Sequence, residues 1–320
     1  MRIVFMGSAP FALPALEALI GEGHRIVQVV TRVDKPVGRG RELAWTPVKS
    51  LAMERGLPVF QPKTLRDPAV HEFLRSLDPD AIVVVAYGRI LPPEVLGIPP
   101  LGCINVHGSL LPRWRGAAPV QWAVIAGDPV SGATVMRMDE GLDTGPILLQ
   151  ESVDVGPEET AESLYRRLAV LGAPLLIRAL RGIAEGTLAP RPQPAEGVTL
   201  APPLTKEDGL LDWTQSRKAL ADRIRGVEPW PGAFSFGPGG LRLRWFAPAC
   251  PGPGTVGPGM PGTVAALDQG ILWVQAGDGL LGLREVQPAG GRRMAVRDLL
   301  AGRRLKIGDR LGPGPGGPTG

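Results

Sequence analysis

Apolar and polar positions alternate in two distinct ways along the first half of the chain. Short, nearly continuous apolar runs are interleaved with longer segments in which apolar residues recur every three or four positions. The runs that predict strands cover 2–7, 26–31, 81–86 and 102–107, and the segments that predict helices cover 9–21, 47–55, 70–77 and 117–126. Because Val- and Ile-rich runs between helices are typical of strands buried on both faces, we expect an α/β, Rossmann-like domain with a mostly parallel sheet.

The second half of the chain changes character after one more helical segment at 163–184. Evenly spaced short apolar runs, separated by Gly and Pro, favour a small β-barrel. These runs cover 241–246, 262–266, 270–275 and 282–286. We therefore predict a first domain at 1–188, a Pro- and Gly-rich linker at 189–204, a barrel domain at 205–311 and a disordered tail at 312–320, with a flexible insertion at 251–261.

The strand predicted at 102–107 ends with the polar residues Asn105 and His107. Side chains two positions apart share one face of an extended strand, so both point the same way while Val106 packs on the opposite side. An amide can donate to a developing oxyanion, and an imidazole can exchange protons near neutral pH. Ligands of open α/β sheets bind at the carboxyl ends of strands. The pair therefore predicts a catalytic site at this sheet edge.

A carboxylate is needed to orient the imidazole, and Asp143 is the candidate. It lies in the polar, Gly-rich segment 138–146, which is typical of an exposed loop. Taken singly, such residues have ordinary structural roles in turns and on surfaces. The chain has three histidines, and His24 and His71 lie in segments that resemble a turn and a helix surface. Of the three, His107 is the one with chemical partners in the sequence.

Composition narrows the class of protein. A length of 320 residues with 44% hydrophobic residues predicts about two domains. Cys103 and Cys250 are too few for a disulfide framework, and the Cys and His spacing offers no zinc motif, so we expect no metal. No apolar run approaches the roughly 20 residues of a bilayer span, and the first residues predict a strand rather than a signal peptide. We expect a cytoplasmic protein without a membrane partner.

The phosphate-binding motifs of nucleotide enzymes are absent from the sequence. The turn at 7–10 lacks the Gly-x-Gly-x-x-Gly pattern, and Pro10 removes an amide that would face a phosphate. The chain also has no Gly-x-x-x-x-Gly-Lys-Ser/Thr segment. We therefore expect neither a bound dinucleotide nor direct nucleotide hydrolysis.

Positive charge is concentrated in the second predicted domain. Residues 205–311 hold 15 Lys and Arg against 10 Asp and Glu, a net charge of +5, which leaves −1 for the remainder of the chain. A basic domain beside a near-neutral one suits contact with a phosphate backbone, although a merely basic solvated surface gives the same count. A second basic element at 34–42 is a polar, Gly-containing loop with Lys35, Arg39 and Arg41.

Residues 103–119, together with Gly141-Leu142-Asp143-Thr144-Gly145, resemble the core of the folate-dependent formyltransferases. Within that family the whole chain is similar to the members that act on methionyl-tRNA, from the opening residues 2–12 to Gln287-Pro288-Ala289-Gly290 and 298–300. The resemblance implies transfer of the formyl group of 10-formyltetrahydrofolate to the α-amino group of methionine on initiator tRNA, for translation initiation. It also implies an OB-like second domain.

The resemblance further implies which residues meet each substrate. The folate would lie along Ser109, Leu110, Leu111 and Pro112, beside a wall that includes Tyr87, Gly88, Ile90 and Leu91. Arg39 would contact the end of the acceptor stem, with Lys35 and Arg41 as phosphate partners, since guanidinium geometry suits both base edges and phosphates. The chain departs from the family pattern at Arg89, where an apolar residue is common, and at Ser8, where threonine is common.

The expected mechanism assigns Asn105 and protonated His107 to the oxyanion of a tetrahedral intermediate, with Asp143 supporting the charge. Neither cysteine is placed as a nucleophile, and the amine needs no covalent enzyme intermediate. Three alternatives remain open: a formyltransferase for a small amine such as a sugar nucleotide or purine precursor, a formyl-folate hydrolase or dehydrogenase relative, and a non-catalytic RNA-binding module. We expect a monomer whose partners are tetrahydrofolate and methionyl-tRNA.

Overall fold

The computed structural model describes residues 1–37, 42–249, 259–302 and 304–314. These residues form two compact units, which are described separately. The first unit comprises the described residues of 1–119, 130–154 and 165–202, and the second comprises 120–129, 155–164 and the described residues from 203 onward. Two short segments of the predicted first domain, 120–129 and 155–164, thus cluster with the second unit.

A seven-stranded sheet forms the centre of the first unit. Its strand order is β10 (Ile147–Asp154), β9 (Val130–Arg137), β7 (Cys103–His107), β6 (Ala81–Val85), β1 (Arg2–Gly7), β2 (Arg25–Val30) and β5 (Val59–Phe60). The pairs from β7 to β5 are parallel, whereas β9 pairs antiparallel with both β7 and β10. The mostly parallel sheet predicted from the apolar runs is confirmed, and β9 and β10 extend it beyond the predicted strands.

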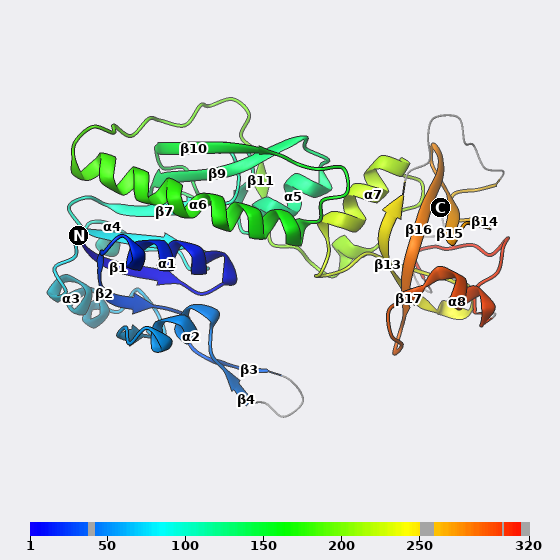
Figure 1. The fold of residues 1–320 in the computed structure, drawn as a ribbon, viewed down its shortest axis with the longest axis horizontal. Coiled ribbons are helices and arrows are strands. Elements are labelled where there is room, and N and C mark those ends of the chain that lie inside the picture. The colour runs from blue at the N-terminus through cyan, green and yellow to red at the C-terminus, as the bar shows by residue number, and fades with distance from the viewer. Residues whose placement is uncertain (38–41, 250–258, 303, 315–320) are drawn as a thin grey trace. The chain divides into compact units, whose positions relative to one another are not determined.

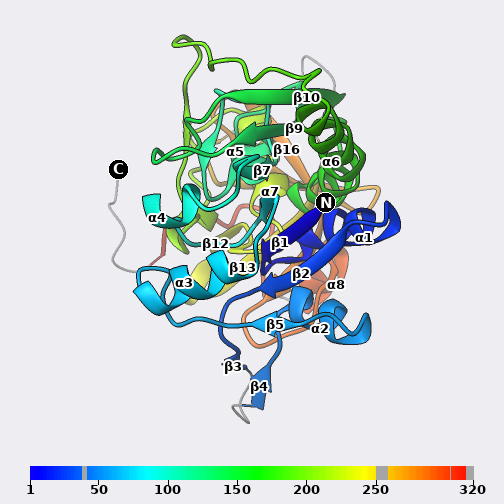
Figure 2. The same ribbon diagram turned by 90° about the vertical axis from the view of Figure 1, so that its left-hand side faces the viewer.

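Helices cover both faces of this sheet, as Figure 2 shows with α3 and α4 on one side and α1, α2 and α6 on the other. The helices are α1 (Leu13–Gly21, preceded by the 3-10 turn Pro10–Ala12), α2 (Pro47–Glu54), α3 (Pro68–Ser76), α4 (Pro93–Leu96) and α6 (Ala161–Ala184). Local sequence sets two of their starts. Thr46 accepts from the Lys49 amide and Asp67 from the Ala69 amide, and each cap precedes a proline, the residue best suited to the first helical position.

The packing of β7 on α6 orients the candidate catalytic pair. A Cβ at Gly172 of α6 would lie 2.7 Å from Val106 Cγ1, so Val106 faces the helix at close range. Since side chains alternate along a strand, Asn105 and His107 face the other side of the sheet. The small residue on α6 and the alternation along β7 together decide where the site lies.

The segment predicted as a linker packs on the first unit over most of its length. Arg191 exchanges two main-chain hydrogen bonds with Ile147, and β11 (Leu200–Ala201) pairs in parallel with β8 (Arg115–Gly116). Proline lacks an amide donor and favours extended backbone, so a proline-rich segment has the composition of a linker. The other main-chain groups of this segment nevertheless form hydrogen bonds with the first unit. Residues 189–202 therefore belong to the first unit rather than bridging freely between two domains.

The basic loop at 34–42 begins and ends in a short hairpin formed by β3 (Lys35–Val37) and β4 (Glu42–Ala44), which projects beyond α2 and β2 in Figure 1. Asp34 at its base contacts the Lys49 ammonium and accepts from Gln61 Nε2 at 2.8 Å. These two hydrogen bonds, with the nearby positive charge, lower the pKa of Asp34 below its ordinary value. The base of the hairpin is therefore tied to α2.

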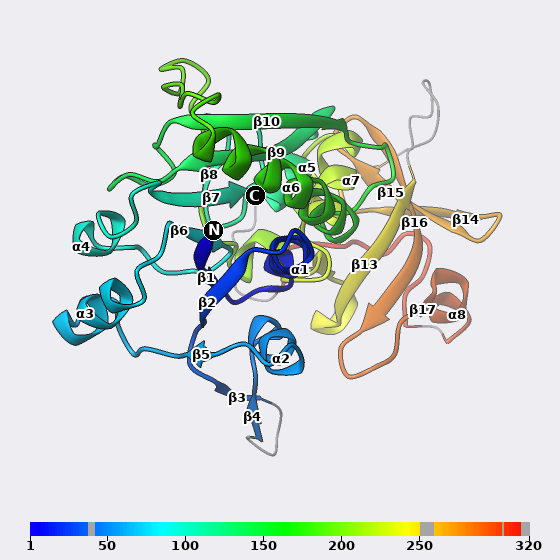
Figure 3. The ribbon, with the colours of Figure 1, turned by 60° about the vertical axis from the view of Figure 1, so that its left-hand side comes forward.

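An antiparallel sheet forms the centre of the second unit (Figure 3). Its order is β12 (Phe234–Phe236), β13 (Arg242–Ala249), β16 (Gly279–Pro288), β15 (Ile271–Ala276) and β14 (Val264–Asp268), with β17 (Met294–Ala295) paired to β16. The unit also contains α5 (Pro119–Ile125), α7 (Arg217–Gly226), α8 (Val296–Ala301) and the 3-10 turns Glu207–Gly209 and Pro238–Gly240. Arg225 of α7 donates to the Glu159 carbonyl at 2.8 Å, which ties segment 155–164 to this unit.

The last described residues connect the two edges of this antiparallel sheet. Arg310 bridges to Thr263 beside β14, and Gly312 exchanges two hydrogen bonds with Phe236 of β12. Both edge strands therefore have partners, which agrees with the predicted barrel-like domain. Gly312 belongs to the fold rather than to a disordered tail. Residues 315–320 of the predicted tail and 251–258 of the predicted insertion lie outside the described residues.

Within the described parts of the chain, none of the helices has both the length and the apolar character needed to cross a lipid bilayer.

Candidate active site

Asn105 and His107 lie at the carboxyl end of β7, where the sheet order changes from parallel to antiparallel. Both side chains are buried, at 9% and 6% exposure. Asn105 is opposite Met136 and His107 is opposite Thr134 on β9. Polar side chains this deeply buried need hydrogen-bonding partners or a substrate that supplies them. The partners of His107 define the site.

Each ring nitrogen of His107 faces an oxygen atom. Nε2 lies 2.9 Å from the carbonyl oxygen of Trp114, and Nδ1 lies 3.7 Å from Oδ2 of Asp143. A carbonyl oxygen only accepts, so the Trp114 contact requires a proton on Nε2. Nδ1 is then the atom that can gain or lose a proton. At 3.7 Å it is close enough to Asp143 for charge attraction but beyond hydrogen-bond length.

Asp143 is held in place from several directions. Its Oδ2 accepts from the Gly116 amide at 2.8 Å, and its own backbone has φ +53°, a conformation that side chains other than glycine adopt infrequently. The loop that contains Asp143 is closed by Asp139, whose Oδ1 accepts from Gly141 N and Thr144 Oγ1. The carboxylate that the sequence proposed as the partner of His107 thus does lie beside it.

Segment 191–201 borders this site, and the sequence prediction did not include any of its residues. Thr199 Oγ1 accepts from the Trp114 amide at 2.8 Å, and Gln193 Nε2 donates to the carbonyl oxygens of Asp143 and Gly145 at 2.7 and 2.8 Å. A Cβ at Gly116 would lie 2.6 Å from the Ala201 carbonyl oxygen, so the close approach of this segment requires glycine. The one sequence signal was a glutamine set between prolines, Pro192-Gln193-Pro194.

Comparison with known proteins decides the family. The family described as "Formyl transferase" matches residues 1–180, and "Formyl transferase, C-terminal domain" matches residues 203–304. The chain belongs to the formyltransferase family.

Relatives of this formyltransferase extend over nearly its whole length. The "Methionyl-tRNA formyltransferase" of Methylobacterium sp. (strain 4-46) is 49% identical over 314 residues, 97% of this chain and 99% of the relative. The protein of the same name from Syntrophus aciditrophicus (strain SB) is 50% identical over 313 residues, 98% and 99% of the two chains. Among solved structures, HypX from Aquifex aeolicus in complex with tetrahydrofolic acid has a TM-score of 0.64 at 18% identity, over 96% of this chain and 48% of that one. At that identity the last likeness concerns the fold.

The segment expected to lie along the folate is firmly packed in this formyltransferase. Ser109 is fully buried, and its Oγ donates to the Arg113 carbonyl at 2.6 Å. Leu111 is buried in an apolar cluster with Met136 and Ile147, while Leu110 packs against Gly132. The structure therefore gives both leucine side chains packing roles, and a ligand beside Ser109–Pro112 would meet mainly the backbone.

The neighbouring wall at 87–91 divides into buried and exposed residues. Tyr87 and Leu91 are buried in the core beside β6, and burial raises the pKa of the Tyr87 hydroxyl. Ile90 is 80% exposed, and Gly88 has φ +75°, which turns the chain outward. Arg89, the departure from the family pattern, donates to the carbonyl oxygens of Pro62 and Lys63. Its guanidinium thus has a local role in holding segment 62–63.

Of the residues expected to contact tRNA, Lys35 is exposed on β3. Arg39 and Arg41 lie outside the described residues. The structure thus describes the base of the basic hairpin, and its tip remains a prediction from the sequence.

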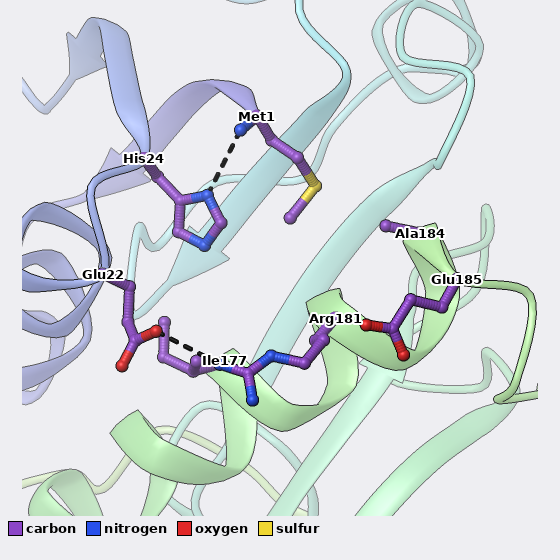
Figure 4. A pocket seen from close by; sticks show the side chains of 7 residues that line it. All are labelled: Met1, Glu22, His24, Ile177, Arg181, Ala184 and Glu185. Carbon is purple, nitrogen blue, oxygen red and sulfur yellow. Dashed lines mark hydrogen bonds and ion pairs between the residues drawn. The ribbon is translucent and has the colours of Figure 1, made fainter.

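A separate cavity of about 250 Å³ lies at the opposite, amino-terminal edge of the parallel strands. Figure 4 shows Met1 beside His24, with their nitrogen atoms 3.4 Å apart, and Glu22 paired with Arg181 of α6 at 3.3 Å. Burial, followed by the charge of the Met1 amino group, lowers the pKa of His24. This cavity is distant in the fold from β7's carboxyl end and does not belong to the candidate active site.

Cys103, two residues before Asn105, is buried and its thiol pKa is raised to about 12 by burial. A thiol that stays protonated at neutral pH is a poor nucleophile. The state of Cys103 therefore favours direct transfer of the formyl group between two bound substrates over a covalent thioester on this residue.

Proposed function

We propose that this protein transfers the formyl group of 10-formyltetrahydrofolate to the α-amino group of methionine on initiator tRNA, the reaction that provides formylmethionyl-tRNA for translation initiation. The observation that carries the proposal is the full-length similarity, at 49–50% identity, to two proteins named methionyl-tRNA formyltransferase. Identity of about one half over nearly the whole of both chains favours the same substrate, methionyl-tRNA, for this protein.

In the proposed reaction the neutral amine attacks the formyl carbon, and Asn105 and His107 stabilise the resulting oxyanion. Donors placed where negative charge develops in the transition state are a major source of catalysis. The pair suits this role because both side chains emerge from the same face of a rigid strand. With Nε2 committed to the Trp114 carbonyl, protonated Nδ1 is the imidazole donor available to the substrate.

Asp143 supports the positive charge on that imidazole and assists proton transfer. The bond from the amine nitrogen to the formyl carbon forms, and the bond from that carbon to the folate nitrogen breaks. Nδ1 of His107 gives its proton to the departing folate nitrogen and regains one from the attacking amine, while Asp143 supports the charge, so the imidazole ends the reaction as it began. Since Gly116 already donates to Oδ2 of Asp143, the carboxylate stays fixed while Nδ1 changes its protonation state.

The folate contacts proposed from the family resemblance are Ser109, Leu110, Leu111 and Pro112, met mainly through their backbone, with Tyr87, Gly88, Ile90 and Leu91 as the neighbouring wall. Exposed Ile90 suits a flat heteroaromatic ring, because such rings bind in mostly apolar clefts with a few main-chain partners. HypX, a fold relative, was solved with tetrahydrofolic acid. We propose Lys35, Arg39 and Arg41 as contacts to the tRNA.

The test is a formyl-transfer assay with purified protein, 10-formyltetrahydrofolate and charged tRNA. We expect turnover with methionyl-initiator tRNA and a much lower kcat/KM with methionyl-elongator tRNA. Turnover of a free aminosugar nucleotide at a comparable kcat/KM would overturn the tRNA assignment. Loss of the formyl group to water in the absence of any amine would indicate a hydrolase instead.

The hairpin is tested by Arg39→Ala. We expect a raised KM for tRNA with little change in the KM for folate, because the substitution removes a tRNA contact only. A kinetic profile identical to that of the unsubstituted protein would rule out this role for Arg39.

A further inference from the structure

Gln193 is a hydrogen-bonding side chain in a proline-rich, extended segment. It is partly buried, whereas its neighbours Pro192 and Pro194 are exposed. Proline fixes its own φ and restricts the residue before it to extended conformations. The two prolines therefore hold the chain around Gln193 straight and leave its side chain directed into the first unit.

The amide of Gln193 is engaged at both ends. Nε2 donates to the carbonyl oxygens of Asp143 and Gly145, at 2.7 and 2.8 Å. Oε1 accepts from Nε and Nη2 of Arg115, at 3.1 and 2.7 Å. Guanidinium groups only donate and main-chain carbonyls only accept, so these partners allow a single orientation of the amide.

The two carbonyls that Gln193 binds belong to a short stretch with little conformational freedom. Asp143 has φ +53°, and a Cβ at Gly145 would lie 1.9 Å from the Arg137 carbonyl oxygen. A backbone in a sparsely populated conformation persists where surrounding contacts hold it. Gln193 supplies such contacts on both sides of Thr144, and it therefore holds the main chain of the residue that carries the carboxylate.

We propose that Gln193 is a positioning residue that holds Asp143 against His107, with Arg115 orienting its amide. This rests on the proposed function, in which Asp143 supports the protonated imidazole. Gln193 does not itself contact His107. It fixes the main chain of Asp143, while the Gly116 amide fixes the side chain. The separation of 3.7 Å between Nδ1 and Oδ2 depends on both attachments.

Catalysis is sensitive to such an arrangement, because misplacement of a reacting group by about 1 Å can cost about 100-fold in rate. Gln193→Glu is the sharpest variant. A carboxylate still accepts from Arg115 but cannot donate to the Asp143 and Gly145 carbonyls, so the anchor remains while the positioning contacts are lost. We expect kcat for formyl transfer to fall about 10- to 100-fold, with KM for folate and for tRNA changed little.

Gln287→Glu is the matched control. Its amide also donates to a main-chain carbonyl, that of Gly291, on an exposed part of the second unit. The chemical change is the same, and kcat should stay close to that of the unsubstituted protein. A kcat for Gln193→Glu equal to that of this control would overturn the proposal.

A double-mutant cycle with Asp143→Ala separates positioning from general stability. If Gln193 acts through Asp143, its substitution should add nothing once the carboxylate is gone, so kcat of the double variant should equal that of Asp143→Ala. If the two substitutions together lower kcat by the product of their separate effects, Gln193 acts independently of Asp143, which would contradict the proposal. Equal melting temperatures of the variants exclude loss of folded protein as the cause.

Amide hydrogen exchange gives a result that does not depend on activity. The Gly116 amide donates to Asp143 Oδ2, whereas the nearby Ala118 amide donates to the Ala201 carbonyl. In Gln193→Glu we expect Gly116 to exchange about tenfold faster and Ala118 to be unchanged. If Gly116 exchanges faster in Gln193→Glu but the unsubstituted protein transfers no formyl group, the proposed function is refuted and the positioning role stands. Unchanged exchange at Gly116 would refute the positioning role alone.

Discussion

His107 Nε2 is 2.9 Å from the main-chain oxygen of Trp114, a contact that decides which ring nitrogen faces Asp143. Trp114 has φ +63°, and the amide of Trp114 is in turn bound by Thr199. A loop that follows β7, held by a segment far along the chain, thus sets the tautomer of the imidazole. The chemistry available to His107 is defined by backbone geometry as much as by its carboxylate neighbour.

The first prediction concerns this tautomer. Neutral His107 should carry its proton on Nε2, because the Trp114 carbonyl can only accept. Nitrogen-15 chemical shifts of the imidazole, measured above neutral pH by long-range correlation spectroscopy, distinguish the two tautomers. A signal pattern with the proton on Nδ1 would contradict the arrangement, and the proposed role of Nδ1 would have to be reassigned.

The second prediction concerns the catalytic groups. His107→Ala and Asp143→Ala should each lower kcat by about 10²- to 10⁴-fold, the range for loss of an acid–base or oriented donor group. Because neither change removes a proposed tRNA contact, the Kd for tRNA should stay nearly constant. Steady-state kinetics and a filter-binding titration measure the two quantities separately. Full activity in both variants would exclude the proposed mechanism.

The third prediction concerns Cys103. Burial raises its pKa to about 12, so at pH 8 it carries about a thousandfold less thiolate than a cysteine of ordinary pKa near 9. Iodoacetamide should leave the Cys103 peptide unmodified in the folded protein and modify it in urea, as followed by mass spectrometry. Cys103→Ala should keep kcat within a few-fold. A collapse of kcat in that variant, with the fold intact, would point to a nucleophilic cysteine.

The fourth prediction concerns pH and the cavity of Figure 4. Burial and the Met1 amino group lower the pKa of His24 below 6.5, so the folded state binds this proton less tightly than the unfolded chain does. The stability that depends on neutral His24 is therefore complete above pH of about 6.5 and is lost as pH falls below it. Thermal unfolding between pH 8 and pH 5 should show a smaller loss of Tm in His24→Gln than in the unsubstituted protein.

Glu22→Gln provides the opposing control for this pH effect. The Glu22 carboxylate raises the pKa of His24, against the effect of burial. Removing its charge should lower the pKa of His24 further and steepen the loss of Tm at acid pH. Identical Tm profiles for both variants would show that His24 does not contribute to the pH dependence of folding.

Much of the first unit could be predicted from the sequence because its signals are local. The alternation of Val- and Ile-rich runs with amphipathic segments located β1, β2, β6 and β7, and the structure confirms the mostly parallel sheet. Strands β9 and β10 were not predicted, since segments such as Val130–Arg137 mix polar and apolar residues. Helices α7 and α8 also went unpredicted, although α7 has a Ser216 cap and buried Leu220 and Ile224 at helical spacing, because the short apolar runs of this region were all interpreted as strands.

The extent of the first unit was harder to predict, because composition alone does not reveal main-chain pairing. A run of Pro, Gly and Ala from 189 to 204 has the composition of a linker. In the structure the carbonyl oxygens of Thr199 and Ala201 accept from amides of residues 115, 117 and 118. Such hydrogen bonds depend on where the chain returns in space, which no local pattern encodes.

The sequence by itself determined that Asn105 and His107 share one face of a strand, since alternation of side chains is a property of any extended chain. Only the tertiary structure decided that Asp143 lies 3.7 Å from His107, and that Gln193, 50 residues beyond Asp143, donates to its carbonyl. The physical reason is the separation along the chain of the groups involved. Spacing along a strand follows from backbone geometry, whereas contacts between distant segments follow from how the whole chain packs.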